Sequence, residues 1–275
     1  MYYKLICSDL DDTLLTSDGR VLPEVKDAVH KYVQNGGKFA IVTGRMTAGA
    51  IPVARMMDIH GEIATYQGAH ITDIDSGRLL FSETIPTADA VRVGRYLEER
   101  GIYYQTYIGD YFYTAVATDY TRLYGRLSFA DFVETKYPLS RYLEENAVCP
   151  PKLLIMQSPD RIPGTLVDLR EKFGKEFLIN TSKPFIIEIV PLSVNKAFAV
   201  RRLAERYGLS VQEVVCVGDS ENDLPMIEFA GVGAVVNNAS DEVKSHADFV
   251  AKSNDEGGLA QVVDFFGSLD APYVR

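Results

Sequence analysis

Three carboxylates crowd into four positions near the start of the chain, within Cys7-Ser8-Asp9-Leu10-Asp11-Asp12-Thr13-Leu14-Leu15. They follow the apolar run Leu5-Ile6-Cys7, which predicts a short strand buried on both faces, as in parallel sheets. The acids would then lie at the carboxyl end of that strand, the edge where open α/β sheets bind ligands. Carboxylates this close repel one another unless a cation or a proton intervenes. We therefore expect a divalent metal site there, and oxygen-only ligands favour Mg²⁺.

The composition indicates a globular chain of one large or two modest domains. Of its 275 residues, 47% are hydrophobic and 24% are charged. The formal net charge of −10 argues against nucleic acid or an anionic membrane surface as the main partner, because the overall field would repel both. Binding of an anionic substrate would therefore require positively charged groups at the site itself.

The cysteine content is typical of a reducing compartment. Cys7, Cys149 and Cys216 share no metal-type spacing, and the first and last lie inside apolar runs, where a small buried side chain is expected. The sequence has no apolar span of about 18 residues and no apolar region of the signal-peptide kind. We expect a cytoplasmic protein that does not bind membranes and is a monomer or a small homo-oligomer.

A second buried strand is predicted at 38–42, after a helical pattern that ends at Asn35-Gly36-Gly37. It delivers Thr43-Gly44-Arg45 to the same sheet edge. A Thr hydroxyl and the free amides of a helix that begins there can hold phosphate oxygens. Thr-Gly at a strand end is common in structural roles, so this interpretation depends on the other segments.

From about Thr84 the sequence changes in character. Helical patterns at 88–100 and 163–173 alternate with strand-like runs at 152–157, 177–180 and 185–190, and tyrosines are frequent between 103 and 113. Most of these tyrosines are expected to pack in a core, and some to line a substrate face. The alternation predicts an inserted α/β module rather than a continuation of the first sheet. We therefore assign residues 1–83 and 188–275 to the core and 84–187 to the insertion.

Two later segments return to the first sheet. Lys196 would lie in the first turn of a helix, where a cation is unfavourable unless anions lie nearby. The buried strand at 214–217 ends in Gly218-Asp219-Ser220-Glu221-Asn222-Asp223. Asp219 and Asp223 would bring two more carboxylates to the edge that holds Asp9.

In this order, the four segments resemble the motifs of the haloacid dehalogenase (HAD) superfamily of phosphohydrolases. The segment from Gly218 to Asp223 is similar to that of Cof-type (subfamily IIB) phosphatases, and the resemblance spans nearly the whole chain, most weakly across 84–187. It implies a Rossmann-like doubly wound parallel-sheet core with an inserted α/β cap domain that sets substrate specificity. It also implies Mg²⁺-dependent hydrolysis of phosphomonoesters of small metabolites, such as sugar phosphates, through an aspartyl phosphate.

The resemblance implies a role for each matching residue, with Asp9 as the nucleophile and Asp11 as the general acid and base. The implied catalytic residues are Asp9, Asp11, Thr43 and Lys196. The implied substrate-binding residues are Leu10, Gly44, Arg45 and Asn222, and Arg45 could equally form a structural ion pair. The implied metal ligands are Asp9, Asp11, Asp219 and Asp223. Relatives commonly have Asn-Gly-Ala and Ser-Lys-Gly where this chain has Gln67-Gly68-Ala69 and Asn195-Lys196-Ala197.

Two functions without turnover remain open from the sequence. Receiver domains also place acids, a Thr and a Lys at a parallel sheet edge, but their phosphorylated Asp ends a middle strand, whereas the strands at 38–42 and 63–66 end without one. The other alternative is a metabolite-binding regulatory protein. Sustained phosphate release would separate an enzyme from both.

Overall fold

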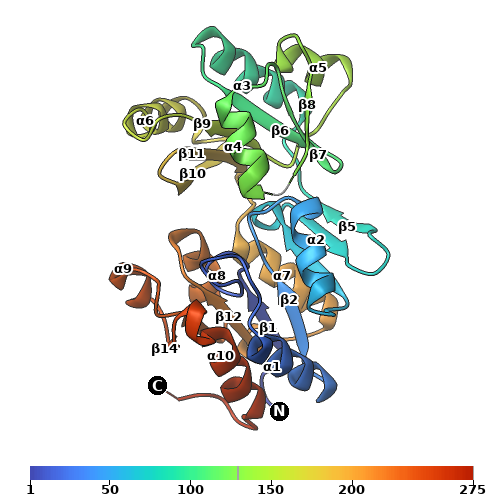
Figure 1. Cartoon of the computed structure of the whole chain (residues 1–275), viewed down its shortest axis with the longest axis vertical. Helices are drawn as coiled ribbons and strands as arrows, with labels where there is room; N and C mark the ends of the chain where they lie inside the picture. Colours follow the sequence, from blue (N-terminus) through green and yellow to red (C-terminus); the bar gives the residue numbers. More distant parts are fainter. Residues whose placement is uncertain (129, 275) are drawn as a thin grey trace. The chain divides into compact units, whose positions relative to one another are not determined.

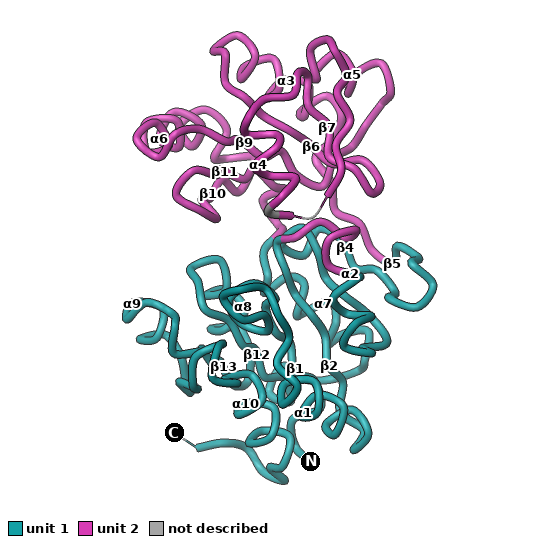
Figure 2. Tube along the Cα trace, viewed as in Figure 1, with its two compact units in different colours: residues 1–44, 51–80, 195–275 teal, residues 45–50, 81–194 magenta. Residues whose placement is uncertain are grey.

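The computed structural model describes residues 1–128 and 130–274 and divides the chain into two compact units. The first unit comprises residues 1–44, 51–80 and 195–275, and the second comprises residues 45–50 and 81–194 (Figure 2). The expected insertion, 84–187, lies within the second unit. The expected boundary at 187/188 falls inside strand β11 (Ile186–Pro191). Its pairing partners, β9 (Leu153–Met156) and β10 (Phe177–Lys183), belong wholly to the second unit.

The first unit is built around a five-stranded parallel sheet in the order β14-β13-β12-β1-β2 (Figure 1). Its strands are β1 (Leu5–Ser8), β2 (Lys38–Ile41), β12 (Val214–Gly218), β13 (Val232–Val235) and β14 (Phe249–Val250). Every residue of β1 and β12 is buried, as their unbroken apolar runs predict for central strands.

Helices connect and cover these strands. They are α1 (Pro23–Gln34), α2 (Thr47–Met56), α7 (Lys196–Tyr207), α8 (Leu224–Phe229), α9 (Asp241–Lys244) and α10 (Gly258–Ser268). The first turn of α2, up to residue 50, is assigned to the second unit. The chain leaves β1 through α1 toward one edge of the sheet, and leaves β12 through α8 toward the other. Because crossovers between parallel strands are right-handed, α1 and α8 lie on opposite faces. The strand order therefore reverses between β1 and β12, the position where doubly wound sheets bind ligands.

A small antiparallel sheet extends this unit beside β2. It consists of β3 (Glu62–Thr65), β4 (His70–Asp73) and β5 (Leu79–Ser82), and the boundary between the units falls inside β5, after residue 80. A parallel bridge joins Val42 to Ala64. The short 3₁₀ turn η1 (Tyr66–Gly68) connects β3 to β4. The hairpin expected between 71 and 80 is therefore present as β4 and β5.

The second unit contains a six-stranded sheet in the order β10-β11-β9-β6-β7-β8, antiparallel except for the β7/β8 pair. Its other strands are β6 (Tyr104–Ile108), β7 (Tyr111–Thr114), β8 (Phe132–Glu134), β9 (Leu153–Met156) and β10 (Phe177–Lys183). Its helices are α3 (Thr87–Glu99), α4 (Asp119–Ser128), α5 (Leu139–Glu145) and α6 (Ile162–Phe173).

A cluster of buried apolar side chains forms a core in the second unit. Side chains of α3, α5 and α6 pack on one face of the sheet, among them Leu97, Leu143 and Phe173. Tyr104 and Tyr107 are buried, whereas Tyr111 is 46% exposed, so the tyrosine-rich run contributes both core and surface side chains. The α/β fold class expected from the sequence is confirmed. Across the described residues, no helix is long and apolar enough to cross a bilayer.

Candidate active site

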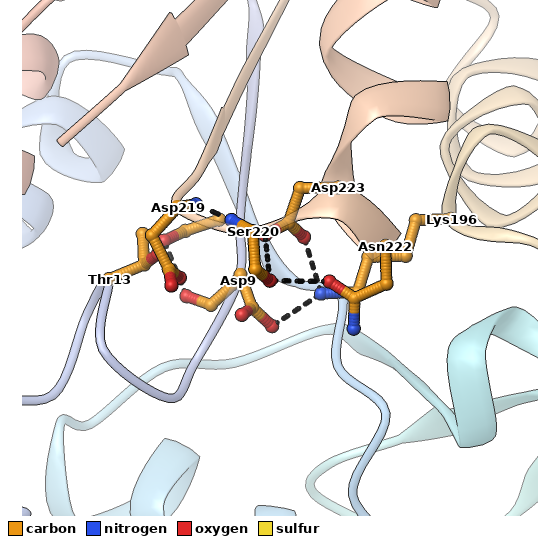
Figure 3. Close-up of polar contacts among 8 residues, drawn as sticks. Asp9, Thr13, Lys196, Asp219, Ser220, Asn222 and Asp223 are labelled. Atoms are coloured by element: carbon orange, nitrogen blue, oxygen red, sulfur yellow. Dashed lines mark hydrogen bonds and ion pairs between the residues drawn. The ribbon is translucent and has the colours of Figure 1, made fainter. Parts of the chain in front are cut away.

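The crowded acids lie where β1 ends, at the reversal of strand order. Asp9 directly follows β1, and its backbone N–H donates to Val217 O of β12 at 2.9 Å. Asp219 directly follows β12, so the neighbouring strands deliver both side chains to one edge. In the described chain, carboxylate oxygens of Asp9, Asp219 and Asp223 lie within 4.8 Å of one another (Figure 3).

Lys196 is the cation of this cluster. Its ammonium lies 2.6 Å from Asp9 Oδ1 and 2.5 Å from Asp223 Oδ1 (Figure 3), and its side chain is fully buried. Asn195 caps α7 by accepting from the Phe198 N–H at 2.9 Å, which fixes Lys196 at the first position of the helix. The two carboxylates offset the unfavourable helix dipole at this position.

Asp223 organises the loop after β12. Its Oδ2 accepts from the backbone N–H of Asp219 at 3.1 Å and of Ser220 at 3.0 Å, and from Ser220 Oγ at 3.1 Å. A methyl group on Gly218 would lie 2.5 Å from Asp223 Cβ, so only glycine fits before Asp219. Asp223 therefore positions both Asp219 and Lys196.

Burial and mutual repulsion make the free acids hard to ionise. Burial raises the pKa of Asp9 well above its usual value, Lys196 opposes this shift, and the charges of Asp223 and Asp219 add to it. Burial and the charge of Asp223 raise the pKa of Asp219 to about 7, against the Thr13 hydroxyl, which donates to Asp219 Oδ1 at 2.6 Å. Burial alone would lower the pKa of Lys196, but Asp223 and Asp9 raise it above its usual value.

This donor set fits a divalent cation such as Mg²⁺. All three side chains offer oxygen, and two of them have raised pKa values because they are buried beside other acids, which a bound cation would offset. Asp11 is not a member of the cluster, so a ligand role for Asp11 remains a prediction.

Two asparagines from the C-terminal part of the chain clasp the loop that follows Asp9. Asn238 Nδ2 donates to Asp12 O at 2.7 Å, and Asn254 Nδ2 donates to Leu15 O at 3.0 Å. The Asn254 N–H also donates to Asn238 Oδ1 at 3.0 Å, which links the two clasping residues. Leu10 is fully buried, and its carbonyl accepts from the N–H groups of residues 14 and 15. The loop that carries Asp11 is therefore held by its own backbone bonds and by the two asparagines.

Thr43 and Gly44 lie beyond β2, the strand beside β1. The Val42 N–H donates to Ser8 O at 2.8 Å, which brings this turn to the edge that holds Asp9. The Thr43 N–H donates to Ala64 O at 2.9 Å, and Thr43 is almost fully buried.

The remaining expected residues have distinct surroundings. Asn222 accepts from Ser220 Oγ at 2.7 Å (Figure 3). Arg45 belongs to the second unit, where Nη1 donates to Gly49 O at 3.4 Å, so its substrate-binding role remains a prediction. Sequence reasoning did not assign roles to Thr13 and Ser220, although both lie inside the two acidic motifs and so could have been found there.

The comparisons with known proteins agree with this geometry. A family model described as haloacid dehalogenase-like hydrolase matches residues 6–263. The chain belongs to this family. It is 30% identical to the 5-amino-6-(5-phospho-D-ribitylamino)uracil phosphatase YwtE of Bacillus subtilis, over 95% of this chain and 97% of that protein.

Solved structures of the family have the same fold. A haloacid dehalogenase-like hydrolase from Bacteroides thetaiotaomicron superposes with a TM-score of 0.86 and 26% identity, over 96% of this chain and 99% of that one. A subclass IIB sugar phosphatase superposes with a TM-score of 0.80 and 18% identity, over 97% and 100%. The expected family and the expected enzyme class, a phosphatase of this family, are confirmed.

Proposed function

We propose that this enzyme is a Mg²⁺-dependent phosphomonoester hydrolase that acts on small phosphorylated metabolites, such as sugar phosphates, through an aspartyl phosphate. The observation that carries the proposal is the ion pair of Asp9 with a fully buried Lys196 beside two further carboxylates. A buried cation next to a carboxylate suits a dianionic phosphate, and buried carboxylates this close together suit a divalent metal.

Asp9 is the nucleophile in this proposal. One of its oxygens bonds to phosphorus as the bond from phosphorus to the ester oxygen breaks. Asp11 gives its proton to the departing alkoxide and then takes a proton from the water that attacks phosphorus, which releases phosphate and restores Asp9. Lys196 favours the ionised form of Asp9 and offsets charge on the transferring phosphoryl group.

The other expected residues bind around these two acids. Asp9, Asp11, Asp219 and Asp223 would hold Mg²⁺, which supplies positive charge to the phosphoryl oxygens when bound. Thr43, Gly44, Leu10, Arg45 and Asn222 would hold the phosphate group. The position of Thr43 and Gly44 after β2, at the sheet edge that holds Asp9, supports this role.

We assign recognition of the alcohol to the second unit, the inserted cap domain. The groups named above act on phosphate, metal and ester oxygen, which all substrates share, so they cannot tell one alcohol from another. The relatives support small phosphorylated metabolites, since one is named for a phosphoribitylamino-uracil and another as a sugar phosphatase. A cytoplasmic monomer or small homo-oligomer remains our prediction, as does the lack of a nucleic-acid partner.

A phosphate-release assay over a panel of phosphomonoesters tests the function. We expect many turnovers per molecule with Mg²⁺, and loss of activity with a chelator that Mg²⁺ restores. Phosphate release that stops after one equivalent, or no release from any ester, would favour a regulatory protein that binds or accepts phosphate without turnover.

A further inference from the structure

The turn η1 has a strained backbone. Tyr66, Gln67 and Gly68 all have positive φ, at 54°, 60° and 102°. Tyr66 and Gln67 are not glycines, and each such residue costs on the order of 1–3 kcal/mol unless its surroundings impose the conformation. Such strain concentrates at functional sites, so the contacts that impose it need an explanation.

Gln67 is attached to the turn after β2. Its backbone N–H donates to Thr43 O at 3.0 Å. Its side chain is directed back at the same turn, because a methyl group added to Gly44 would lie 2.5 Å from Gln67 Nε2. Gln67 is 8% exposed, so its carboxamide is enclosed while it packs on Gly44.

Gly68 is attached to the start of α7. A methyl group on Gly68 would lie 2.8 Å from Ala199 Cβ and 3.0 Å from Asn195 O. Asn195 is the cap that precedes Lys196. Within three residues, η1 therefore contacts both the Thr43-Gly44 turn and the helix end that carries Lys196. The left-handed backbone lets one short turn reach both.

We propose that Gln67 is a positioning residue for phosphate binding, whose carboxamide packs on Gly44 and holds the Thr43-Gly44 turn at a fixed separation from Lys196. This inference rests on the proposed function, because it takes Gly44 and Lys196 as two of the groups that hold the phosphate. The positioning role gives a functional reason for the strained backbone of η1. An ordinary core contact would stabilise the fold without setting the affinity for phosphate.

Gln67→Gly is the direct test, because glycine adopts positive φ without strain and the variant removes only the side chain. The Kd for inorganic phosphate, measured by calorimetry with Mg²⁺, should rise at least about fivefold, while the urea midpoint changes little. Gln67→Asn keeps a carboxamide and tolerates positive φ, so it should restore most of the affinity. Gln34→Ala, on the exposed end of α1, is the control and should leave the Kd unchanged.

A double-mutant cycle tests the contact itself. Gly44→Ala should weaken phosphate binding, because its methyl displaces the carboxamide of Gln67. In Gly44→Ala/Gln67→Gly the methyl has room, so the combined loss should be smaller than the product of the two single losses by at least about threefold. Gln34→Ala in place of Gln67→Gly should give no such recovery.

The outcomes separate this inference from the proposed function. Unchanged phosphate affinity in Gln67→Gly, or independent effects in the cycle, would overturn the positioning role even in an active phosphatase. A wild type that binds phosphate with this coupling but hydrolyses no ester would remove the proposed function and leave the positioning role. If Gly44→Ala does not fold, the comparison of Gln67→Gly with Gln67→Asn decides alone.

Discussion

Replacing Lys196 by Met should destabilise the protein strongly and in a pH-dependent way. The substitution keeps an unbranched side chain of similar length but removes the charge between Asp9 and Asp223. At 2.6 and 2.5 Å, each ion pair has a Coulomb energy of about 6 kcal/mol with an effective dielectric constant of about 20. Removing Lys196 also removes the cost of burying its charge, so the net loss of unfolding free energy is smaller than the sum of the two Coulomb energies. Loss of one partner from a buried ion pair typically costs about 3–5 kcal/mol, and we expect a loss of this size at pH 8.

The sign of the pH dependence follows from the carboxylates that remain. Burial and neighbouring acids already raise the pKa of Asp9, and without Lys196 its folded-state pKa rises further above the unfolded value. For an acid with a raised folded pKa, the cost of ionisation accumulates as the pH rises from the unfolded to the folded pKa. The loss of unfolding free energy caused by Lys196→Met should therefore be smaller at pH 5 than at pH 8.

Urea unfolding of the metal-free protein at both pH values measures this deficit. The matched control is Lys244→Met in α9, where the same change removes a cation that lies 3.9 Å from an exposed Asp241. This control should lose no more than about 1 kcal/mol, as surface pairs do. A Lys196→Met protein within about 1 kcal/mol of wild type at pH 8, or an equal deficit at pH 5, would refute the reasoning.

The remaining predictions concern two acids and one histidine. Asp9→Asn should reduce phosphate release at least about a thousandfold, because an amide cannot act as the nucleophile; near wild-type release would assign the nucleophile elsewhere. Asp219→Asn should raise the Mg²⁺ concentration for half-maximal activity about tenfold or more, and an unchanged metal titration would remove Asp219 from the metal site. Burial lowers the pKa of His70 to about 4, so the unfolded chain takes up a proton at higher pH than the folded protein does. Stability should then fall by up to about 3 kcal/mol as the pH drops from 6.5 to 4, and His70→Gln should reduce this loss in urea titrations at both pH values; equal losses in the two proteins would exclude His70 as its source.

The sequence predicted the parts of the site that lie in short contiguous motifs. Asp9, Asp219 and Lys196 each follow a strong local signal, a buried strand or a helix start, and parallel strands must then bring their ends to one edge. The bond from Thr13 to Asp219 joins residues that are 206 positions apart, and no local pattern specifies which side chains meet at that separation.

Other features depend on tertiary contacts that the sequence does not display. Helix α4 (Asp119–Ser128) was not predicted, because its tyrosines and polar residues resemble the strand-like runs before it. The expected boundary at 187/188 falls inside β11 because a run of apolar strand residues has the same sequence pattern in either unit. The positive φ of Tyr66 and Gln67 is imposed by neighbours rather than by residue type, so only the structure shows it.

The hydrogen bonds from Asn238 and Asn254 to the loop after Asp9 have a consequence for folding during synthesis. Asn254 lies 239 positions after Leu15, whose carbonyl it binds, and Asn238 lies 226 positions after Asp12. At about 5–20 residues per second, a ribosome needs roughly 10–50 seconds to make the intervening chain. During that time the nascent protein already contains Asp9 and Asp11, but the two asparagines that bind their loop have not yet been made. Formation of these two hydrogen bonds is therefore among the last folding events. Incomplete chains released from the ribosome would carry Asp9 and Asp11 in a loop that lacks them.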